Sequence, residues 1–118
     1  MIVAEFSRIN NGFRMRIEGH AGYGEVGKDI VCAATSGIAY ALCGYLMNFK
    51  KDGFKVKSFE RGKIDIECSA DCEDYLQLAC LGIYQIACEY PENVFVNIGA
   101  WNWKMMHGAR SDHHINTL

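Results

Sequence analysis

This chain has almost no proline and no marked surplus of either charge, and its first residues do not read as a positively charged leader. Its 118 residues include one proline, and 12 basic against 14 acidic residues leave a formal net charge of −2. That balance predicts no broad basic face, so direct nucleic-acid binding is not expected. Glu5 interrupts the first residues before any long apolar run, and the longest apolar stretch, around residues 38–47, is shorter than a membrane span requires. We therefore expect a cytoplasmic protein without membrane contact.

Cysteine is plentiful, but its pattern argues against a disulfide framework or a metal site. Without a secretion signal, the six cysteines are expected to be free thiols in a reducing compartment. Cys68 and Cys72 are four residues apart, yet a zinc site needs three or four converging ligands, and a second pair is missing. We therefore expect no metal and no cofactor.

Two apolar periodicities alternate along the chain. Short runs in which every second residue is apolar predict strands, and the Asn-Asn-Gly turn at residues 10–12 predicts a hairpin between the first two. A run with a helical repeat follows each pair of strands. The order ββαββαβ predicts an α+β fold: a two-layer sandwich with a mixed or antiparallel five-stranded sheet and two helices on one face. We expect one domain over residues 1–103 and a loosely ordered tail over residues 104–118.

The first predicted helix, over residues 29–51, has little polar surface. Apolar side chains fall on one broad stripe of the helix, and the opposite line is small and uncharged. Such a helix is usually covered on both sides, here by the sheet, the preceding loop or a partner subunit. The second helix is predicted to begin at Asp71 as N-cap and to end before Pro91. The stripe of the first helix comprises Ile30, Ala34, Ile38, Ala41, Leu42, Tyr45 and Phe49, and its opposite line comprises Cys32, Ser36, Ala39 and Cys43.

A glycine-rich loop between the second strand and the first helix carries the strongest functional signal. His20 precedes it, Asp29 is placed to cap the helix, and Cys32 then falls at about the third helical residue. The positive end of the helix dipole favours a thiolate there, which is the reactive form of cysteine. His20 is expected to stabilise this thiolate and to protonate a leaving amine, and Ser36 to donate to the sulfur or to an oxyanion. The loop, with Tyr23 in it, predicts a mobile flap through its glycines, Gly19, Gly22, Gly24 and Gly27.

The spacing of His20 and Cys32 alone does not decide whether the loop is catalytic. A histidine followed by a helical cysteine is also an ordinary packing pair, because free cysteine is among the most buried residue types. The Asp29 carboxylate would disfavour a thiolate that it faced, so the cap must be directed away from the Cys32 sulfur. Strand alternation places His20 on the polar face, so either a bend at Gly19 redirects it or the site lies beyond the sheet edge. Backbone N–H groups at the helix start are expected to stabilise the oxyanion.

Together these residues resemble the signature of the ribosomal-processing cysteine protease family, Prp, a group of small bacterial proteins. The signature is a Gly-His pair, a glycine-containing loop, then Asp, two residues and Cys, with Ser four residues later. Each part is present within residues 19–36. The order ββαββαβ over residues 1–103 is also similar to that of the family, and the tail has no counterpart in it.

The resemblance implies a specific activity. Family members remove an N-terminal extension from large-subunit ribosomal protein twenty-seven, cutting after a pair of aromatic residues. By this resemblance Cys32 is the nucleophile, His20 is the base and acid, Asp29 and Ser36 support the site, and the flap closes over an extended peptide. Members are homodimers, so a homodimer is expected. Two rival functions also fit the residues: a thiol redox sensor at Cys32, and a ribosome-associated binding module without chemistry.

Overall fold

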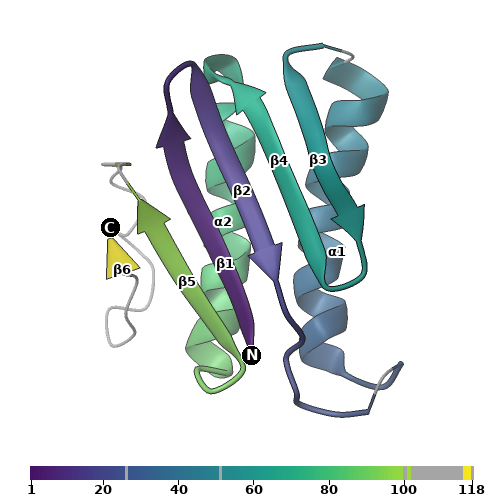
Figure 1. Ribbon diagram of the computed structural model, residues 1–118. Coiled ribbons are helices and arrows are strands. Elements are labelled where there is room, and N and C mark those ends of the chain that lie inside the picture. Colours follow the sequence, from purple (N-terminus) through teal and green to yellow (C-terminus); the bar gives the residue numbers. More distant parts are fainter. Residues whose placement is uncertain (26, 51, 100, 102–115, 118) are drawn as a thin grey trace.

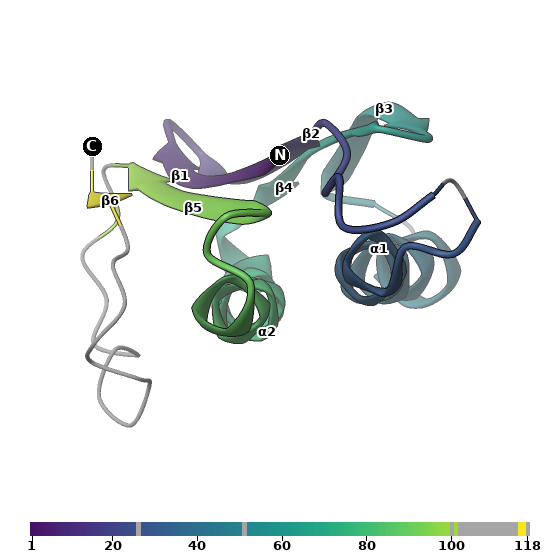
Figure 2. The same cartoon turned by 90° about the horizontal axis from the view of Figure 1, so that it is seen from below.

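Both long helices pack on one face of a single sheet, and no helix in the described part of the chain covers the other face (Figure 1). This computed structural model describes residues 1–25, 27–50, 52–99, 101 and 116–117. Figure 2 shows the two layers edge-on. They confirm the predicted α+β sandwich. The elements are β1 (Ile2–Ile9), β2 (Gly12–Glu18), α1 (Ile30–Tyr45), a π-helical turn η1 (Leu46–Lys50), β3 (Phe54–Glu60), β4 (Lys63–Ser69), a 3-10 turn η2 (Ala70–Cys72), α2 (Glu73–Glu89), β5 (Val94–Gly99) and β6 (Asn116–Thr117).

The sheet is mixed, with the strand order β3-β4-β2-β1-β5-β6. The pairs β1–β2, β2–β4 and β3–β4 are antiparallel, whereas β5 runs parallel to β1. The two-residue strand β6 pairs in parallel with β5 and adds a sixth strand to the five predicted. Apart from β6, the tail predicted over residues 104–118 lies outside the described residues.

The strand pairing brings four chain segments to one end of the sheet. Glu18, the last residue of β2, lies opposite both Val3 of β1 and Lys63 of β4. The β3–β4 turn is therefore at this end too. Because β5 is parallel to β1, with Val94 opposite Ile2, the turn between α2 and β5 also arrives there. The loop from β2 to α1 leaves from this end, so residues far apart in sequence can contact it.

Alternating side chains of the four central strands form the core under the helices. Ala4, Phe6, Met15 and Ile66 are fully buried on this face, and the turn at residues 10–11 closes the predicted hairpin. In β3 the pairing with β4 shifts between Val56 and Ser58. A bulge of this kind changes which residues face the core. Phe59 consequently lies against Tyr40 of α1, with ring centroids 5.2 Å apart.

The sheet covers the line of smaller side chains on α1, a choice that the sequence left open. Val31, Thr35, Ala39, Leu42 and Cys43 are buried, and only Leu42 of these belongs to the broad apolar stripe. The large apolar residues of that stripe are mostly exposed, because the sheet covers the line of smaller side chains instead. The periodicity reveals two apolar lines on one helix but does not show which line the sheet covers. The exposed members include Ile30 (57%), Tyr45 (43%) and Phe49 (73%).

The first helix has nearly the bounds predicted for it. Together α1 and η1 make a continuous helix of 21 residues, Ile30–Lys50, with mean hydropathy 1.7. By length and composition alone this helix is enough to cross a membrane, although the apolar run around residues 38–47 is shorter than a span. The core helix of a globular protein passes the same test, and a third of this segment is buried.

The start of α2 differs from the prediction as well. Its N-cap position is occupied by Cys72, which makes no side-chain capping bond, and the 3-10 turn η2 precedes it. The carboxylate of Asp71 instead accepts hydrogen bonds from the Lys50 ammonium (Nζ to Oδ2, 2.7 Å) and the Ser69 hydroxyl. Asp71 is therefore not the N-cap. The helix is most buried at its N-cap, Cys72, and along one side at Leu76, Ala79, Cys80 and Ile83.

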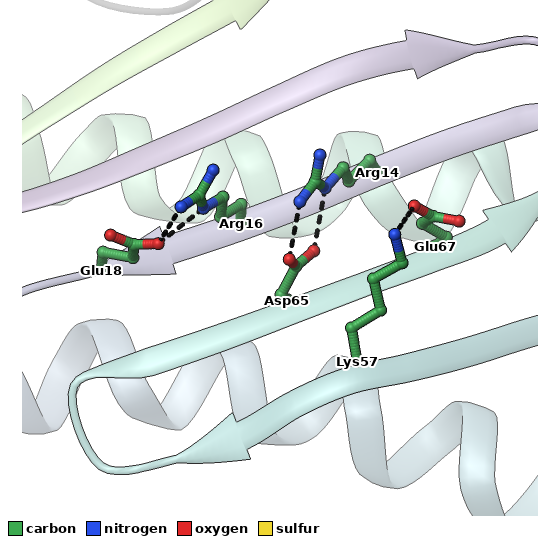
Figure 3. A network of polar contacts seen from close by, with 6 residues as sticks. All are labelled: Arg14, Arg16, Glu18, Lys57, Asp65 and Glu67. Atoms are coloured by element: carbon green, nitrogen blue, oxygen red, sulfur yellow. Dashed lines mark hydrogen bonds and ion pairs between the residues drawn. The ribbon is translucent and has the colours of Figure 1, made fainter.

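The face of the sheet away from the helices carries several ion pairs (Figure 3). Arg14 donates two hydrogen bonds to Asp65, at 2.9 and 2.7 Å, and holds the pKa of that carboxyl below its usual range. Lys57 pairs with Glu67 at 2.6 Å, and Arg16 pairs with Glu18. Basic and acidic groups therefore alternate on this face instead of forming a basic surface.

Candidate active site

A cavity of about 680 Å³ opens at the end of the sheet where the four segments meet. Its walls come from the β2–α1 loop, the first turns of α1 and the β3–β4 turn, and Ile2, Ile17 and Ile64 form an apolar part of them. Within the described residues no group of three histidine, cysteine or acidic side chains could hold a metal ion. The predicted site residues other than Tyr23 all line the cavity: Gly19, His20, Gly22, Gly24, Gly27, Asp29, Cys32 and Ser36.

Asp29 organises the start of α1. It is the N-cap, with extended backbone, and its side chain is buried at 8% exposure. Oδ1 accepts the backbone N–H of Val31 (3.0 Å) and of Cys32 (2.9 Å). Oδ2 accepts those of Tyr23 (2.9 Å) and Gly24 (3.1 Å) in the loop. These donors, Cys32 first, hold the pKa of the Asp29 carboxyl below its usual range.

Cys32 is the third residue of α1, as predicted from the cap. Its side chain is half-buried, and its sulfur accepts a hydrogen bond from the backbone N–H of Ala21 at 3.1 Å. The Asp29 carboxylate accepts only backbone N–H groups among the described contacts, and no hydrogen bond joins it to the sulfur. The sulfur therefore has a fixed donor beside it and an opening to the cavity.

Several N–H groups at the start of α1 are already engaged, which bears on the expected oxyanion site. The N–H groups of Val31 and Cys32 donate to the Asp29 carboxylate, and that of Ala33 donates to the Asp29 carbonyl oxygen at 3.0 Å. These three donors would have to leave the helix cap to stabilise an oxyanion, so their role there stays a prediction. Among the described contacts, the backbone donor that reaches the sulfur is the Ala21 N–H, from the loop.

His20 follows a bend at Gly19 and lines a cavity at the end of the sheet, so both arrangements that strand alternation allowed contribute. Gly19 has a φ of +98°, and a Cβ there would collide with the Met1 carbonyl oxygen. The Gly19 N–H donates to the Gly62 carbonyl oxygen at 2.9 Å, and the His20 ring lies over Gly62, where an added Cβ would come within 2.9 Å of Nε2. In the described part of the chain, no hydrogen bond joins His20 to Cys32, although both line one cavity.

The flap is held firmly on its N-terminal side. The Tyr23 ring packs edge-on against Tyr90, with centroids 5.1 Å apart, and Asn93 Nδ2 donates to the Ala21 carbonyl oxygen at 2.8 Å. Further along, Lys28 N–H donates to the Glu25 carbonyl oxygen at 2.9 Å. The loop is therefore attached to the turn between α2 and β5.

Sequence reasoning missed the residues that come from other elements. Gly62 belongs to the β3–β4 turn, and Tyr90 and Asn93 flank Pro91 after α2. None of them carries a local motif. The available signal is the alternation of apolar residues at 94–98, which predicts a strand. Parallel pairing of that strand with the first would have placed Asn93 beside the flap.

The chain is similar to a known protein family and to several solved structures. The sequence profile described as "Cysteine protease Prp" matches residues 1–95. A crystal structure of SMU.848 from Streptococcus mutans is 30% identical, with a TM-score of 0.64, covering 83% of this chain and 93% of that one. No curated protein matches the chain.

Two further solved structures share the fold. Both are of an essential ribosomal processing protease Prp from S. aureus. One is in complex with a covalently linked product peptide (24% identity, TM-score 0.71) and the other with a substrate peptide (22% identity, TM-score 0.68). Each alignment covers 83% of this chain and 99% of the other.

Proposed function

The chain belongs to the cysteine protease Prp family, and from this membership we propose that it processes a ribosomal protein precursor. The S. aureus relatives are ribosomal processing proteases that hold a substrate or product peptide. The proposed substrate is the N-terminal extension of large-subunit ribosomal protein twenty-seven, cut after a pair of aromatic residues. The proposed setting is the cytoplasm of a bacterium.

The observation that carries this proposal is the arrangement around Cys32. A half-buried sulfur at the third residue of α1 accepts a backbone N–H and opens with His20 into one cavity. The helix dipole and the amide donor both favour the thiolate, which is the nucleophilic form. The acidic neighbour, Asp29, is engaged by four backbone donors and does not compete for the sulfur.

In the proposed reaction, the Cys32 thiolate attacks the carbonyl carbon of the second aromatic residue, at the peptide bond that is cut. The C–N bond of the tetrahedral intermediate breaks, and His20 as imidazolium gives its proton to the leaving amine. Neutral His20 then takes a proton from water, whose hydroxide oxygen attacks the thioester. The acid product leaves and the thiolate and imidazolium are restored. His20 must approach Cys32 during each cycle, and a catalytic contact of this kind often tightens only when substrate binds.

The remaining site residues have supporting roles in this proposal. Ser36, one turn after Cys32, lines the cavity and is placed to donate to the peptide. The flap, with Gly22, Gly24, Gly27 and the half-exposed ring of Tyr23, covers the bound peptide. The apolar wall of the cavity suits an aromatic side chain of the substrate.

The test is cleavage of a synthetic peptide that spans the extension, followed by mass spectrometry. We expect one cut after the aromatic pair by the wild type and none by Cys32→Ala or His20→Ala. Cys43→Ala is the matched control, because it removes a fully buried thiol from the same helix and leaves the cavity intact. It should cleave at a rate close to that of the wild type.

Other outcomes separate the rival functions. Cleavage by Cys32→Ala would exclude Cys32 as the nucleophile. A wild type that binds the peptide without cutting it would indicate a binding module. Reversible oxidation of Cys32 by peroxide, without any peptide turnover, would favour a redox sensor.

The exposed helix surface supports a homodimer. An apolar groove of about 510 Å³ lies between α1 and α2. Leu78 at its edge is 73% exposed, as is Phe49 at the end of the same helix layer. Exposed apolar patches of this kind mark protein interfaces. Ile38, Ala41, Leu42, Tyr45, Tyr75, Leu78, Ala79 and Gly82 line the groove.

Sedimentation velocity tests the dimer. We expect the wild type to sediment as a dimer and Leu78→Asp to sediment as a folded monomer. Lys55→Asp is the control, because it changes an exposed side chain of β3, outside the groove. A wild type that stays monomeric at high micromolar concentration would contradict the proposed dimer.

A further inference from the structure

Ala21 is held on both sides by polar contacts, although it lies in a loop. Its side chain is buried at 2% exposure. Its N–H, from the peptide group that joins it to His20, donates to the Cys32 sulfur at 3.1 Å. Its carbonyl oxygen, from the following peptide group, accepts a hydrogen bond from Asn93 Nδ2 at 2.8 Å. The orientation of both peptide groups is therefore fixed by side chains from outside the loop.

Asn93 is a rigid support for this contact. Its own N–H donates to the Tyr90 carbonyl oxygen at 2.9 Å, and its carbonyl oxygen accepts the Ile2 N–H at 2.8 Å. These bonds attach its backbone to the end of α2 and to the first residue of β1. The amide group can therefore hold Ala21 against the sheet without moving with the loop.

We propose that Asn93 is a positioning residue for the nucleophile, which acts by holding the Ala21 N–H against the Cys32 sulfur. An N–H donor stabilises the charged form of an acceptor more than the neutral form. A loop peptide that could rotate would present this donor only part of the time, because fixing a backbone conformation has an entropy cost. The Asn93 side chain removes that freedom before any peptide binds. Asn93 acts on the sulfur through the Ala21 peptide groups.

The link also explains why the last long strand matters to the site. Asn93 immediately precedes β5, and the parallel pairing of β5 with β1 sets its position. In the sequence it lies far beyond Cys32, after both β4 and α2. The geometry points to a sulfur whose reactivity depends on the docking of the α2–β5 turn, and not only on the helix that carries it.

The test is the pH dependence of Cys32 alkylation by iodoacetamide, measured from mildly acidic to alkaline pH. The inference rests on the proposed role of Cys32 as nucleophile, but this readout needs no peptide turnover. Asn93→Ala removes the donor, and Asn93→Leu removes it at nearly the same side-chain volume without adding a charge. Glu92→Ala is the control, because Glu92 is an exposed neighbour in the same turn.

We expect the midpoint of the alkylation profile to move up by about half to one pH unit in both Asn93 variants, since losing a donor to the thiolate disfavours it. At neutral pH the alkylation rate should fall by about 3- to 10-fold, because each unit is a factor of ten in thiolate fraction. Glu92→Ala should match the wild type. Asn93→Gln, which keeps the amide, should recover part of the shift.

Thermal unfolding separates positioning from a loss of structure. If Asn93→Ala does not fold, Asn93→Leu supplies the same comparison at nearly unchanged volume and charge. Wild-type alkylation profiles in both folded variants would overturn the proposal. A shifted profile combined with a wild type that cannot cleave the extension peptide would support the positioning role and contradict the proposed function, so the two failures are distinguishable.

Discussion

An aspartate and a cysteine lie close to the start of each long helix, yet only one of the two pairs has the properties of a reactive site. At α1, Asp29 is buried and accepts four backbone N–H groups, and Cys32 is half-buried beside the Ala21 N–H. At α2, Asp71 is exposed and bonds to side chains, and Cys72 is fully buried. The same two residue types therefore serve different purposes at the two helix starts.

Exposure and donors explain the difference better than the presence of an acidic neighbour. A thiol becomes a nucleophile where the thiolate is stabilised and the solvent or substrate can reach it. Near the start of α2, burial first and the neighbouring Cys72 second raise the pKa of the Cys68 thiol to about 12. In the first helix, burial raises the pKa of Cys43 to about 11. A cysteine near a helix N-terminus is thus reactive only if the fold leaves it a donor and an opening.

The largest expected contrast is in alkylation of the native protein. With iodoacetamide at slightly alkaline pH, Cys32 should react at least about 100-fold faster than Cys43 or Cys68, because the thiolate fraction falls tenfold for each unit between pH and pKa. Burial also denies the reagent access to Cys72. Peptide mapping by mass spectrometry after a short pulse measures this. Comparable labelling of Cys68 and Cys32 in the folded protein would contradict it.

The two aspartates should differ next in their effect on stability. Asp29→Ala removes the helix cap and two loop contacts together, and should lower the unfolding midpoint by about 5 °C or more. Asp71→Ala breaks an exposed ion pair and should lower it by about 2 °C or less. Differential scanning calorimetry gives both values. Equal losses would mean that the cap of Asp29 does not hold the loop.

The stabilising effect of Asp29 should depend on pH in a defined direction. Its folded pKa is depressed, so its contribution is fully present above the unfolded value of about 3.9 and is lost as pH falls through the folded value. The difference in unfolding midpoint between wild type and Asp29→Asn should therefore be constant near neutrality and shrink below about pH 4. A difference for Asp29→Asn that widens in acid would contradict the assignment.

Salt separates the two aspartates in the same way. In about 1 M salt the difference in unfolding midpoint for Asp71→Asn should shrink, while that for Asp29→Asn persists.

The parts of the site that could be predicted from sequence are those that depend on near neighbours. A cap acts within three residues, so the identity of Asp29 is enough to place Cys32 at the third helical position. The hairpin is equally local. By contrast, Asn93 reaches Ala21 through strand pairing between the two ends of the chain, and such non-local contacts leave no motif.

Burial on α1 was a point that sequence reasoning left open. The sequence showed two apolar lines, and the sheet covers smaller residues such as Ala39, which allow close approach, while Ile30 and Phe49 are exposed. At α2 the capping pattern suggested Asp71, but Lys50 from the end of the first helix binds that carboxylate. Tertiary neighbours decided both points, and at Asp71 they outweighed a local preference.

The smallest expected effect concerns an unused hydroxyl near Cys32. Thr35 is 1% exposed and its Oγ1 has no hydrogen-bond partner among the described residues, whereas the first turn of α2 buries the apolar Leu76. A buried hydroxyl without a partner is destabilising, so Thr35→Val should raise the free energy of unfolding by about 1 kcal/mol. Urea denaturation measures this, with Thr35→Ala as a control that also removes a methyl group and should be less stable than Thr35→Val. Because Thr35 also borders the cavity, a Thr35→Val variant that is more stable but cleaves the peptide about tenfold more slowly would show that the hydroxyl is kept for the substrate, at the expense of the fold.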